Sequence, residues 1–266
     1  MILSQPVGAE HELWNACKSV GVELIDAAEQ LNKAFSEIDQ SGFIHRISVT
    51  ALGRLLLGKI LPPQYEQIIY IDGDTQIVSS LRQLEELTVP AGKFFAAADY
   101  TVLASALKGE SEPFYFNSGV LKFERNGWIG EKAFKYFAEN PHGKTHDQRA
   151  LNAVAGTDVI QISNKWNFPK HFLHLVDRSE LAIVHYMAHP KPWHGVFYPW
   201  SKIESTVYKD TLTRFPALAS LRTPLSPMRY LGYKYRSLKA RFRAGPEKNS
   251  EREIISEFLA TNDKPA

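Results

Sequence analysis

Apolar stretches of strand length alternate along the chain with stretches whose apolar residues repeat at helical spacing. The strand-like runs cover 22–26, 68–71, 94–98, 116–123, 159–162 and 181–186. The helix-like stretches cover 13–20, 54–61, 128–137 and 147–154. This alternation predicts βαβ units, and therefore an α/β protein with a mainly parallel sheet flanked by helices.

Two carboxylates follow the run from Ile68 to Ile71, whose β-branched and aromatic residues are typical of a strand buried on both faces. Open α/β sheets bind ligands at the carboxyl ends of their strands, which is where Asp72 and Asp74 would lie. Gly73 between them permits close backbone approach. Two hard anionic ligands at this spacing suit Mg²⁺ or Mn²⁺, and such an ion suits a diphosphate. The alternative is a solvated turn, because a D-x-D arises by chance about once in a chain of this size.

Further polar residues interrupt or follow the later strands. A polar triplet runs from Asn117 to Gly119, and a glycine inside a strand often marks close approach by a ligand or another backbone. His185 ends an apolar run, and Lys191 follows in a proline-bounded loop. An imidazole can complete a metal site begun by carboxylates, and an ammonium can neutralise a phosphate. Structural roles remain open for all of them, and Asp147 at a predicted helix start is by itself a capping acid.

Composition narrows the choice of partner and compartment. The chain has 266 residues, 44% of them hydrophobic, and its 31 basic and 29 acidic residues leave a net charge of +2, which gives no argument for a nucleic-acid partner. The single cysteine, Cys17, forms no internal disulfide and fits a reducing compartment. No apolar run approaches the roughly 18 residues that span a bilayer, and the start lacks the pattern of a signal peptide. We therefore predict a cytoplasmic protein.

The C-terminal part of the chain differs from the rest. Prolines interrupt it repeatedly, so the compact fold is expected over 1–200 and a proline-rich, basic extension over 201–266. Within that extension the segment 229–243 has six basic residues, no acidic one and four aromatic ones. It is predicted to hold the protein peripherally against an anionic membrane, and the alternative is a solvated basic tail.

Several segments, taken in order, resemble the family 8 retaining glycosyltransferases, the group that includes bacterial lipopolysaccharide galactosyl- and glucosyltransferases and glycogenin. They are RISVTALGRLLLGKILP (46–62), IIYIDGDTQIVSSLRQL (68–84), FNSGVLKFERNGW (116–128), HDQRALNAV (146–154), KWNF (165–168) and VHYMAHPKPWHG (184–195). Together they cover most of residues 1–195, and the ordered set is far more specific than any one motif.

The resemblance implies a GT-A fold over 1–200, and a Mn²⁺ (or Mg²⁺) ion held by Asp72, Asp74 and His185. It implies transfer of a hexose from a UDP-sugar, with retention, to a hydroxyl of a lipopolysaccharide or other cell-surface glycan. Gln148 is implied to face the reacting side of the sugar, with Asp147 orienting its hydroxyls. An amide is a poor nucleophile, which favours attack by the acceptor on the same face. The residues implied to contact the donor are Arg54, Asp72, Gly73, Asp74, Asp99, Asn117, Ser118 and Lys191.

The chain departs from the family pattern at three places. Ala188 stands where the family usually has a glycine, which is expected to crowd the donor phosphates, and Ala51 stands where a polar residue is common. The first βα unit, which carries contacts to the nucleotide base, is expected to be absent, because the chain enters at the second strand. The missing strand would lie between 2–4 and 68–71, so we expect the working gene product to start upstream.

Two other functions compete with this one. A phosphohydrolase of the haloacid dehalogenase type also uses paired aspartates after a strand, but its threonine lies four residues after the first acid, whereas Thr75 lies three after Asp72. A non-catalytic sugar-nucleotide binder of the same fold is the stronger alternative, given the absent start and Ala188.

Overall fold

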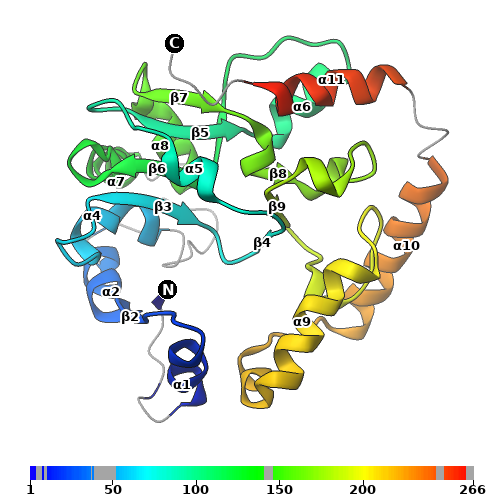
Figure 1. The fold of residues 1–266 in the computed structure, drawn as a ribbon, viewed down its shortest axis with the longest axis horizontal. Coiled ribbons are helices and arrows are strands. Elements are labelled where there is room, and N and C mark those ends of the chain that lie inside the picture. The colour runs from blue at the N-terminus through cyan, green and yellow to red at the C-terminus, as the bar shows by residue number, and fades with distance from the viewer. Residues whose placement is uncertain are drawn as a thin grey trace.

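The computed structural model describes residues 1–3, 8, 11–36, 38, 52–140, 146–243 and 249–261, and Ala51 lies outside these ranges. The N-terminal elements lie below the central strands in Figure 1, and Leu31 packs with Leu56 and Ile60 in one apolar cluster. They are β1 (Ile2–Leu3), α1 (Glu12–Ser19), β2 (Ile25–Asp26) and α2 (Ala28–Ser36). Strands β1 and β2 pair in parallel as a separate two-stranded sheet.

A four-stranded sheet forms the centre of the fold, in the order β3-β6-β5-β7. Its strands are β3 (Gln67–Ile71), β5 (Phe94–Ala98), β6 (Phe116–Glu124) and β7 (Val159–Ile162). The α/β class is confirmed, and the sheet is mixed, since β6 runs antiparallel to both β3 and β5 while β5 and β7 are parallel. A continuous apolar run predicts burial on both faces, which β5 shows in full, but it does not set strand direction.

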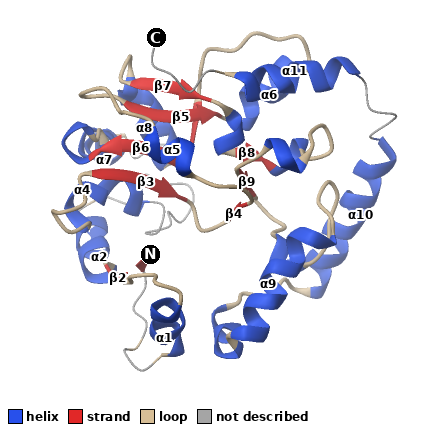
Figure 2. Ribbon diagram, in the orientation of Figure 1, coloured by secondary structure: helices blue, strands red, loops and turns tan. Residues whose placement is uncertain are grey.

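Short helices cover this sheet, and Figure 2 shows them around the strands. Helices α7 (Gly130–Glu139) and α8 (Asp147–Ala155) share one core with β3, β5, β6 and the turn η1 (Arg54–Leu56), which continues into α4 (Leu57–Ile60). In α7, Ala133 and Phe137 are fully buried one turn apart, the spacing that makes one face of a helix apolar. The remaining elements of this part are α5 (Arg82–Glu86), α6 (Tyr100–Ala106) and the turns η2 (Arg125–Gly127) and η3 (Asn164–Trp166).

A second sheet of three short strands brings distant segments to the end of β3. Its order is β4-β9-β8, with β4 (Thr75–Ile77), β8 (Phe168–Pro169) and β9 (Ile183–His185). Thr75 pairs with His185, and the Tyr186 N–H donates to the Asp74 carbonyl at 2.9 Å. The pairing therefore places the histidine beside the acids that follow β3. The turns η4 (Lys170–Phe172), η5 (Arg178–Glu180) and η6 (Pro192–His194) lie around this sheet.

The C-terminal residues form α9 (Lys202–Arg214), η7 (Pro216–Leu221), α10 (Pro227–Arg243) and α11 (Asn249–Ala260). Helix α11 packs on the core, because Ile255 is fully buried in a cluster with Phe168 and Val184. The Ser163 hydroxyl also donates to the Leu259 carbonyl at 2.7 Å. A domain boundary at residue 200 stays a prediction. Among the described helices, none combines the length and apolar character required to cross a bilayer.

Candidate active site

Three potential metal ligands converge at the ends of β3 and β9. The ligand atoms of Asp72, Asp74 and His185 all lie within 4.8 Å of one another. Nε2 of His185 lies 3.1 Å from Asp74 Oδ1 and 3.8 Å from Asp72 Oδ2. The two acids are partly exposed and the histidine is buried, so the cluster opens to solvent on the side of the carboxylates.

Gly119 makes room for this histidine. A Cβ atom added at Gly119 would lie 2.2 Å from His185 Cε1, far inside van der Waals contact. The backbone carbonyl of the same glycine accepts from the Asp72 N–H at 2.7 Å. The glycine within the apolar strand β6 therefore marks a close approach, as its position in the sequence predicts, and what approaches is the imidazole.

A chain of amides fixes which nitrogen of His185 carries a proton. The Asn117 side-chain NH₂ donates to the Asp99 carboxylate at 2.9 Å, so its Oδ1 accepts from the Gly119 N–H and from Asn167 Nδ2, each at 2.9 Å. The Asn167 amide oxygen then faces His185 Nδ1 at 2.9 Å, which assigns the proton to Nδ1. In the neutral imidazole Nε2 is left with a free lone pair directed at the two aspartates, the form that binds a metal.

Lys191 neutralises Asp74 from the opposite side. Its ammonium forms an ion pair with Asp74 Oδ2 and donates to the Tyr186 carbonyl at 2.8 Å. Burial alone would raise the pKa of Asp74, but the His185 imidazole when it is protonated, and the Lys191 ammonium, outweigh it and hold this pKa below its ordinary value. Asp74 is therefore a carboxylate at any physiological pH.

The side chain of Arg54 contacts both Asp72, in the cluster of potential metal ligands, and Asp147, at the start of α8. Its guanidinium lies 3.0 Å from Asp72 Oδ1 and 2.8 Å from Asp147 Oδ2, and it donates to Ser118 Oγ at 2.7 Å. Burial lowers the pKa of Arg54, but Asp147 and Asp72 more than compensate and raise it. Burial raises the pKa of Asp147, and Arg54 opposes that shift. The buried guanidinium of Arg54 thus forms ion pairs with the carboxylates of both Asp72 and Asp147.

Gln148 is held in a fixed orientation beside these groups. Its Oε1 accepts from Asn117 Nδ2 at 3.1 Å and from the Ser118 N–H at 3.2 Å. Its Nε2 donates to Asp99 Oδ2 at 3.1 Å. Asp99 uses its other oxygen to cap helix α6, accepting from the Thr101 N–H at 3.0 Å. The site is thereby linked to rigid elements on each side.

Comparison with known protein families gives a match over most of the chain. The family model described as "Glycosyl transferase family 8" matches residues 9–196. The chain belongs to glycosyl transferase family 8. The resemblance inferred from the sequence motifs is confirmed.

Curated relatives of this family 8 protein come from bacteria and plants. General stress protein A of Bacillus subtilis (strain 168) is 24% identical over 198 residues, which are 60% of this chain and 66% of that protein. Galactinol synthase 6 of Arabidopsis thaliana is 26% identical over 162 residues, 49% of this chain and 46% of that protein. The chain spans less than two thirds of the length of each.

Solved structures of LgtC share the fold. An active-site mutant of LgtC matches with a TM-score of 0.60 at 19% identity, over 79% of this chain and 82% of that chain. The galactosyltransferase LgtC in complex with donor and acceptor sugar analogs matches with a TM-score of 0.53 at 22% identity, over 80% and 79%. The GT-A fold of the family 8 protein is thereby confirmed.

The structure brings nearly all the predicted site residues of the family 8 protein together. Gly73 is exposed, and a Cβ atom there would meet nothing within 4 Å, so no contact with the described residues requires a glycine between the acids, and its contact with the donor stays a prediction. Ala188 is exposed with a φ of 56°, in the left-handed region that favours glycine. The glycine expected at this position is therefore explained by backbone conformation within the chain itself.

Three residues of the site were missed from the sequence. Tyr70 lies in the apolar run of β3, and its hydroxyl donates to Asp72 Oδ1 at 2.5 Å. Asn167 orients His185, and Lys170 donates to the carbonyls of Ala188 and Pro190 at 3.1 and 2.7 Å. For Asn167 the available signal was its place between two aromatic residues, because a buried amide needs hydrogen-bonding partners.

Proposed function

We propose that the protein is a metal-dependent retaining glycosyltransferase that moves a hexose from a UDP-sugar to a hydroxyl acceptor. The observation that carries the proposal is the cluster of Asp72, Asp74 and His185, with Lys191 directly beside it. The galactosyltransferase LgtC, which shares the fold, is described in complex with donor and acceptor sugar analogs, and one relative is a galactinol synthase. These names support a galactosyl-type hexose donor for this chain.

The three potential ligands, Asp72, Asp74 and His185, fit Mn²⁺ or Mg²⁺. Two carboxylates and one imidazole suit Mn²⁺, whereas a site for Mg²⁺ alone would be expected to consist of oxygen ligands. The amide chain that ends at Asn167 leaves Nε2 of His185 free for coordination. A bound ion would supply charge stabilisation for the diphosphate leaving group.

Lys191 adds a second positive charge at the same place. Departure of UDP increases the negative charge on the diphosphate, so a cation beside it stabilises the transition state more than the ground state. Lys191 is nearly buried, at 9% exposure, which strengthens its electrostatic effect. We assign it to the leaving-group phosphates.

Gln148 and Asp147 are assigned to the sugar. The Gln148 amide has both its ends hydrogen-bonded to protein groups, so it supports positive charge on the ring through its dipole and does not form a covalent intermediate. Asp147, paired with Arg54, orients the sugar hydroxyls. We therefore favour attack by the acceptor hydroxyl on the face from which UDP leaves.

Helix α10 supports peripheral attachment to a membrane. Its apolar side chains at spacings of three and four residues remain exposed, by 81%, 62%, 66%, 55% and 80% for Met228, Leu231, Tyr235, Leu238 and Phe242. Six basic residues occur in the same helix, and no acidic residue occurs in it. Such a helix suits the surface of an anionic membrane, here the cytoplasmic face, where a lipopolysaccharide precursor or other glycolipid acceptor would be available.

Turnover of sugar nucleotides tests the proposal directly. The full chain is incubated with Mn²⁺ and a panel of UDP-hexoses, with release of UDP as the readout. We expect one UDP-hexose to be consumed, and chelation to stop the reaction. Binding of UDP without release for any hexose would favour the non-catalytic binder.

A further inference from the structure

Lys170 is buried, with only 4% of its surface exposed, although lysine is almost never buried in folded proteins unless it is paired. It follows strand β8 in the turn η4, and its Nζ donates to the carbonyls of Ala188 at 3.1 Å and Pro190 at 2.7 Å. Nζ also lies 5.2 Å from the centre of the Trp200 ring. Because β8 and β9 are paired in parallel, this side chain joins the segments that follow two neighbouring strands.

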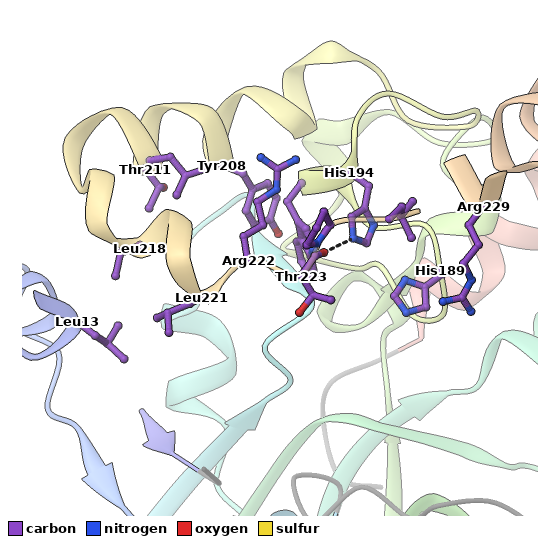
Figure 3. Close-up of a pocket in the computed structure, with 14 residues that line it drawn as sticks. Leu13, His189, His194, Tyr208, Thr211, Leu218, Leu221, Arg222, Thr223 and Arg229 are labelled. Carbon is purple, nitrogen blue, oxygen red and sulfur yellow. Dashed lines mark hydrogen bonds between the residues drawn. The ribbon is translucent and has the colours of Figure 1, made fainter. Parts of the chain in front are cut away.

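The hydrogen bond to Pro190 reaches the peptide unit that leads into Lys191. The carbonyl of Pro190 and the N–H of Lys191 belong to one planar peptide group. Lys170 donates to that carbonyl, and Nδ1 of His194 accepts from that N–H at 3.0 Å. The dashed line in Figure 3 marks the contact of 3.3 Å between Nε2 of His194 and the Thr223 carbonyl. The peptide group is therefore held at both edges, by a buried lysine and by a histidine that is itself held.

This peptide group determines where the side chain of Lys191 starts. The Lys191 ammonium forms an ion pair with Asp74 and donates to the Tyr186 carbonyl at 2.8 Å. The stem of a lysine is flexible, so the position of its ammonium is well defined only when the backbone at its base is fixed as well. The hydrogen bonds of Lys170 therefore act on the cation that we assign to the leaving-group phosphates.

Lys170 acts through its hydrogen bonds more than through its charge. Burial, and then the charge of Lys191, lower the pKa of Lys170 to about 7. Above this pH the group is mainly a neutral amine, which still has two N–H groups for the two carbonyls. Both charge states can therefore hold the peptide unit.

Lys122 provides an internal comparison. It is buried on β6, at 1% exposure, and its Nζ donates to the carbonyls of Leu84 at 2.9 Å and Glu85 at 2.6 Å. Those carbonyls belong to helix α5, which contains none of the residues assigned to the donor. The two lysines form the same kind of interaction, and they differ in whether the segment that they hold leads into a residue of the active site.

We propose that Lys170 is a positioning residue, which keeps the ammonium of Lys191 directed at the leaving-group phosphates by fixing the peptide unit before it. The inference rests on the proposed function, in which Lys191 stabilises the departing UDP. Loss of Lys170 then lowers kcat more than it changes KM, because the contact that it supports strengthens in the transition state. Loss of both lysines costs no more activity than loss of Lys191 alone.

A double-mutant cycle in the full chain tests this, with Lys170→Met, Lys191→Met and both together. Turnover of the UDP-hexose with Mn²⁺, affinity for UDP by calorimetry and the melting temperature are measured for each variant. We expect Lys191→Met to lower kcat about 100-fold, the usual effect of losing one charge-stabilising group, and Lys170→Met to lower it about tenfold. The double variant should match Lys191→Met within about twofold, because the two residues act as a unit. Lys170→Arg keeps N–H donors and should retain more activity than Lys170→Met.

Lys122→Met is the matched control, because it removes two hydrogen bonds of the same kind and should lower the melting temperature without lowering kcat. Losses that multiply in the double variant would overturn the proposal. So would a comparable fall of kcat in Lys122→Met, or equal losses in Lys170→Arg and Lys170→Met. If no UDP-hexose is consumed, the transferase function fails, and the same cycle is followed through the affinity for UDP. Non-additive losses of that affinity would then support the positioning role by itself, and additive losses would overturn it.

Discussion

The amide oxygen of Asn167 lies 2.9 Å from Nδ1 of His185 and so decides which ring nitrogen faces the acidic pair. Replacing Asn167 with leucine removes this acceptor, and the imidazole then loses both its tautomer preference and its orientation. We expect the affinity for Mn²⁺ to fall about 10- to 100-fold, the usual effect of losing such a supporting hydrogen bond. Calorimetry with Mn²⁺ measures it. Asn167→Asp keeps an acceptor and should retain more affinity, and equal losses in both variants would contradict the tautomer argument.

Asp74→Asn should abolish transfer while the protein remains folded. The change removes a ligand charge from a partly exposed position at a strand end, where no apolar packing depends on it. Turnover of the UDP-hexose and the melting temperature are measured together. Asp210→Asn is the control, since Asp210 is an exposed acid on α9. Wild-type activity that survives thorough chelation would show that the metal is dispensable.

Gly119→Ala should damage the metal site and the fold together. The added Cβ would lie 2.2 Å from His185 Cε1 and 2.9 Å from Asn117 Oδ1, so the imidazole must move. Overpacking of this kind costs about 1 to 3 kcal/mol of the free energy of unfolding. Denaturant unfolding gives that cost, and Mn²⁺ titration gives the loss of affinity. Gly58→Ala is the control, because a Cβ there meets nothing within 4 Å.

Lys170 makes stability depend on pH above neutrality. Burial first, and then the charge of Lys191, lower the pKa of Lys170 to about 7. In the unfolded chain it is about 10.4, so between these values the unfolded state binds more protons and the free energy of unfolding rises with pH. The slope from this residue is at most about 1.4 kcal/mol per pH unit. Urea unfolding from pH 7 to 10 should show the slope in the wild type and lose it in Lys170→Met.

The exposed stripe of α10 should govern attachment to vesicles. Replacing Leu231 and Phe242 with asparagine removes two strongly exposed apolar side chains, 62% and 80% accessible, without touching the basic residues. We expect weaker cosedimentation with phosphatidylglycerol vesicles at low salt. Ile203→Asn, at a 78% exposed apolar position on α9, is the control. Unchanged cosedimentation of the double variant would exclude α10 as the contact. Deleting 225–266 is a poorer test, because Ile255 is part of the core.

The sequence predicts the strands of the four-stranded sheet better than those of the two smaller sheets. The runs at 94–98 and 159–162 became strands with those same bounds, whereas 22–26 shortened to Ile25–Asp26 and 181–186 to Ile183–His185. Where a strand begins and ends depends on the strand that it pairs with, and that partner comes from a distant part of the chain. For the same reason the sequence does not predict that β6 runs antiparallel to β5. The direction of a strand depends on how the chain connects it to its neighbours and not on its own composition.

Only part of the site could be predicted from the sequence. Asp72 and Asp74 follow a strand and His185 ends one, which is a local signal, and the family motifs indicate Arg54 and Gln148. The role of Asn167 depends on hydrogen bonds to Asn117 and His185, which are 50 and 18 residues away along the chain. No local pattern encodes a relationship of that kind, because it exists only once the three segments meet.

Helix α10 is anchored to the rest of the protein over much of its length. Lys234 donates to the Val196 carbonyl at 2.8 Å, the Tyr230 ring meets Phe197 at 5.7 Å between centroids, and the Ser237 hydroxyl accepts from the Tyr198 N–H. If this helix rests on a bilayer, the reaction centre is held at one height above the lipid surface. The enzyme would then select acceptors by the distance between their hydroxyl and their lipid anchor. Only a hydroxyl that stands at that height above the lipid would meet the donor sugar.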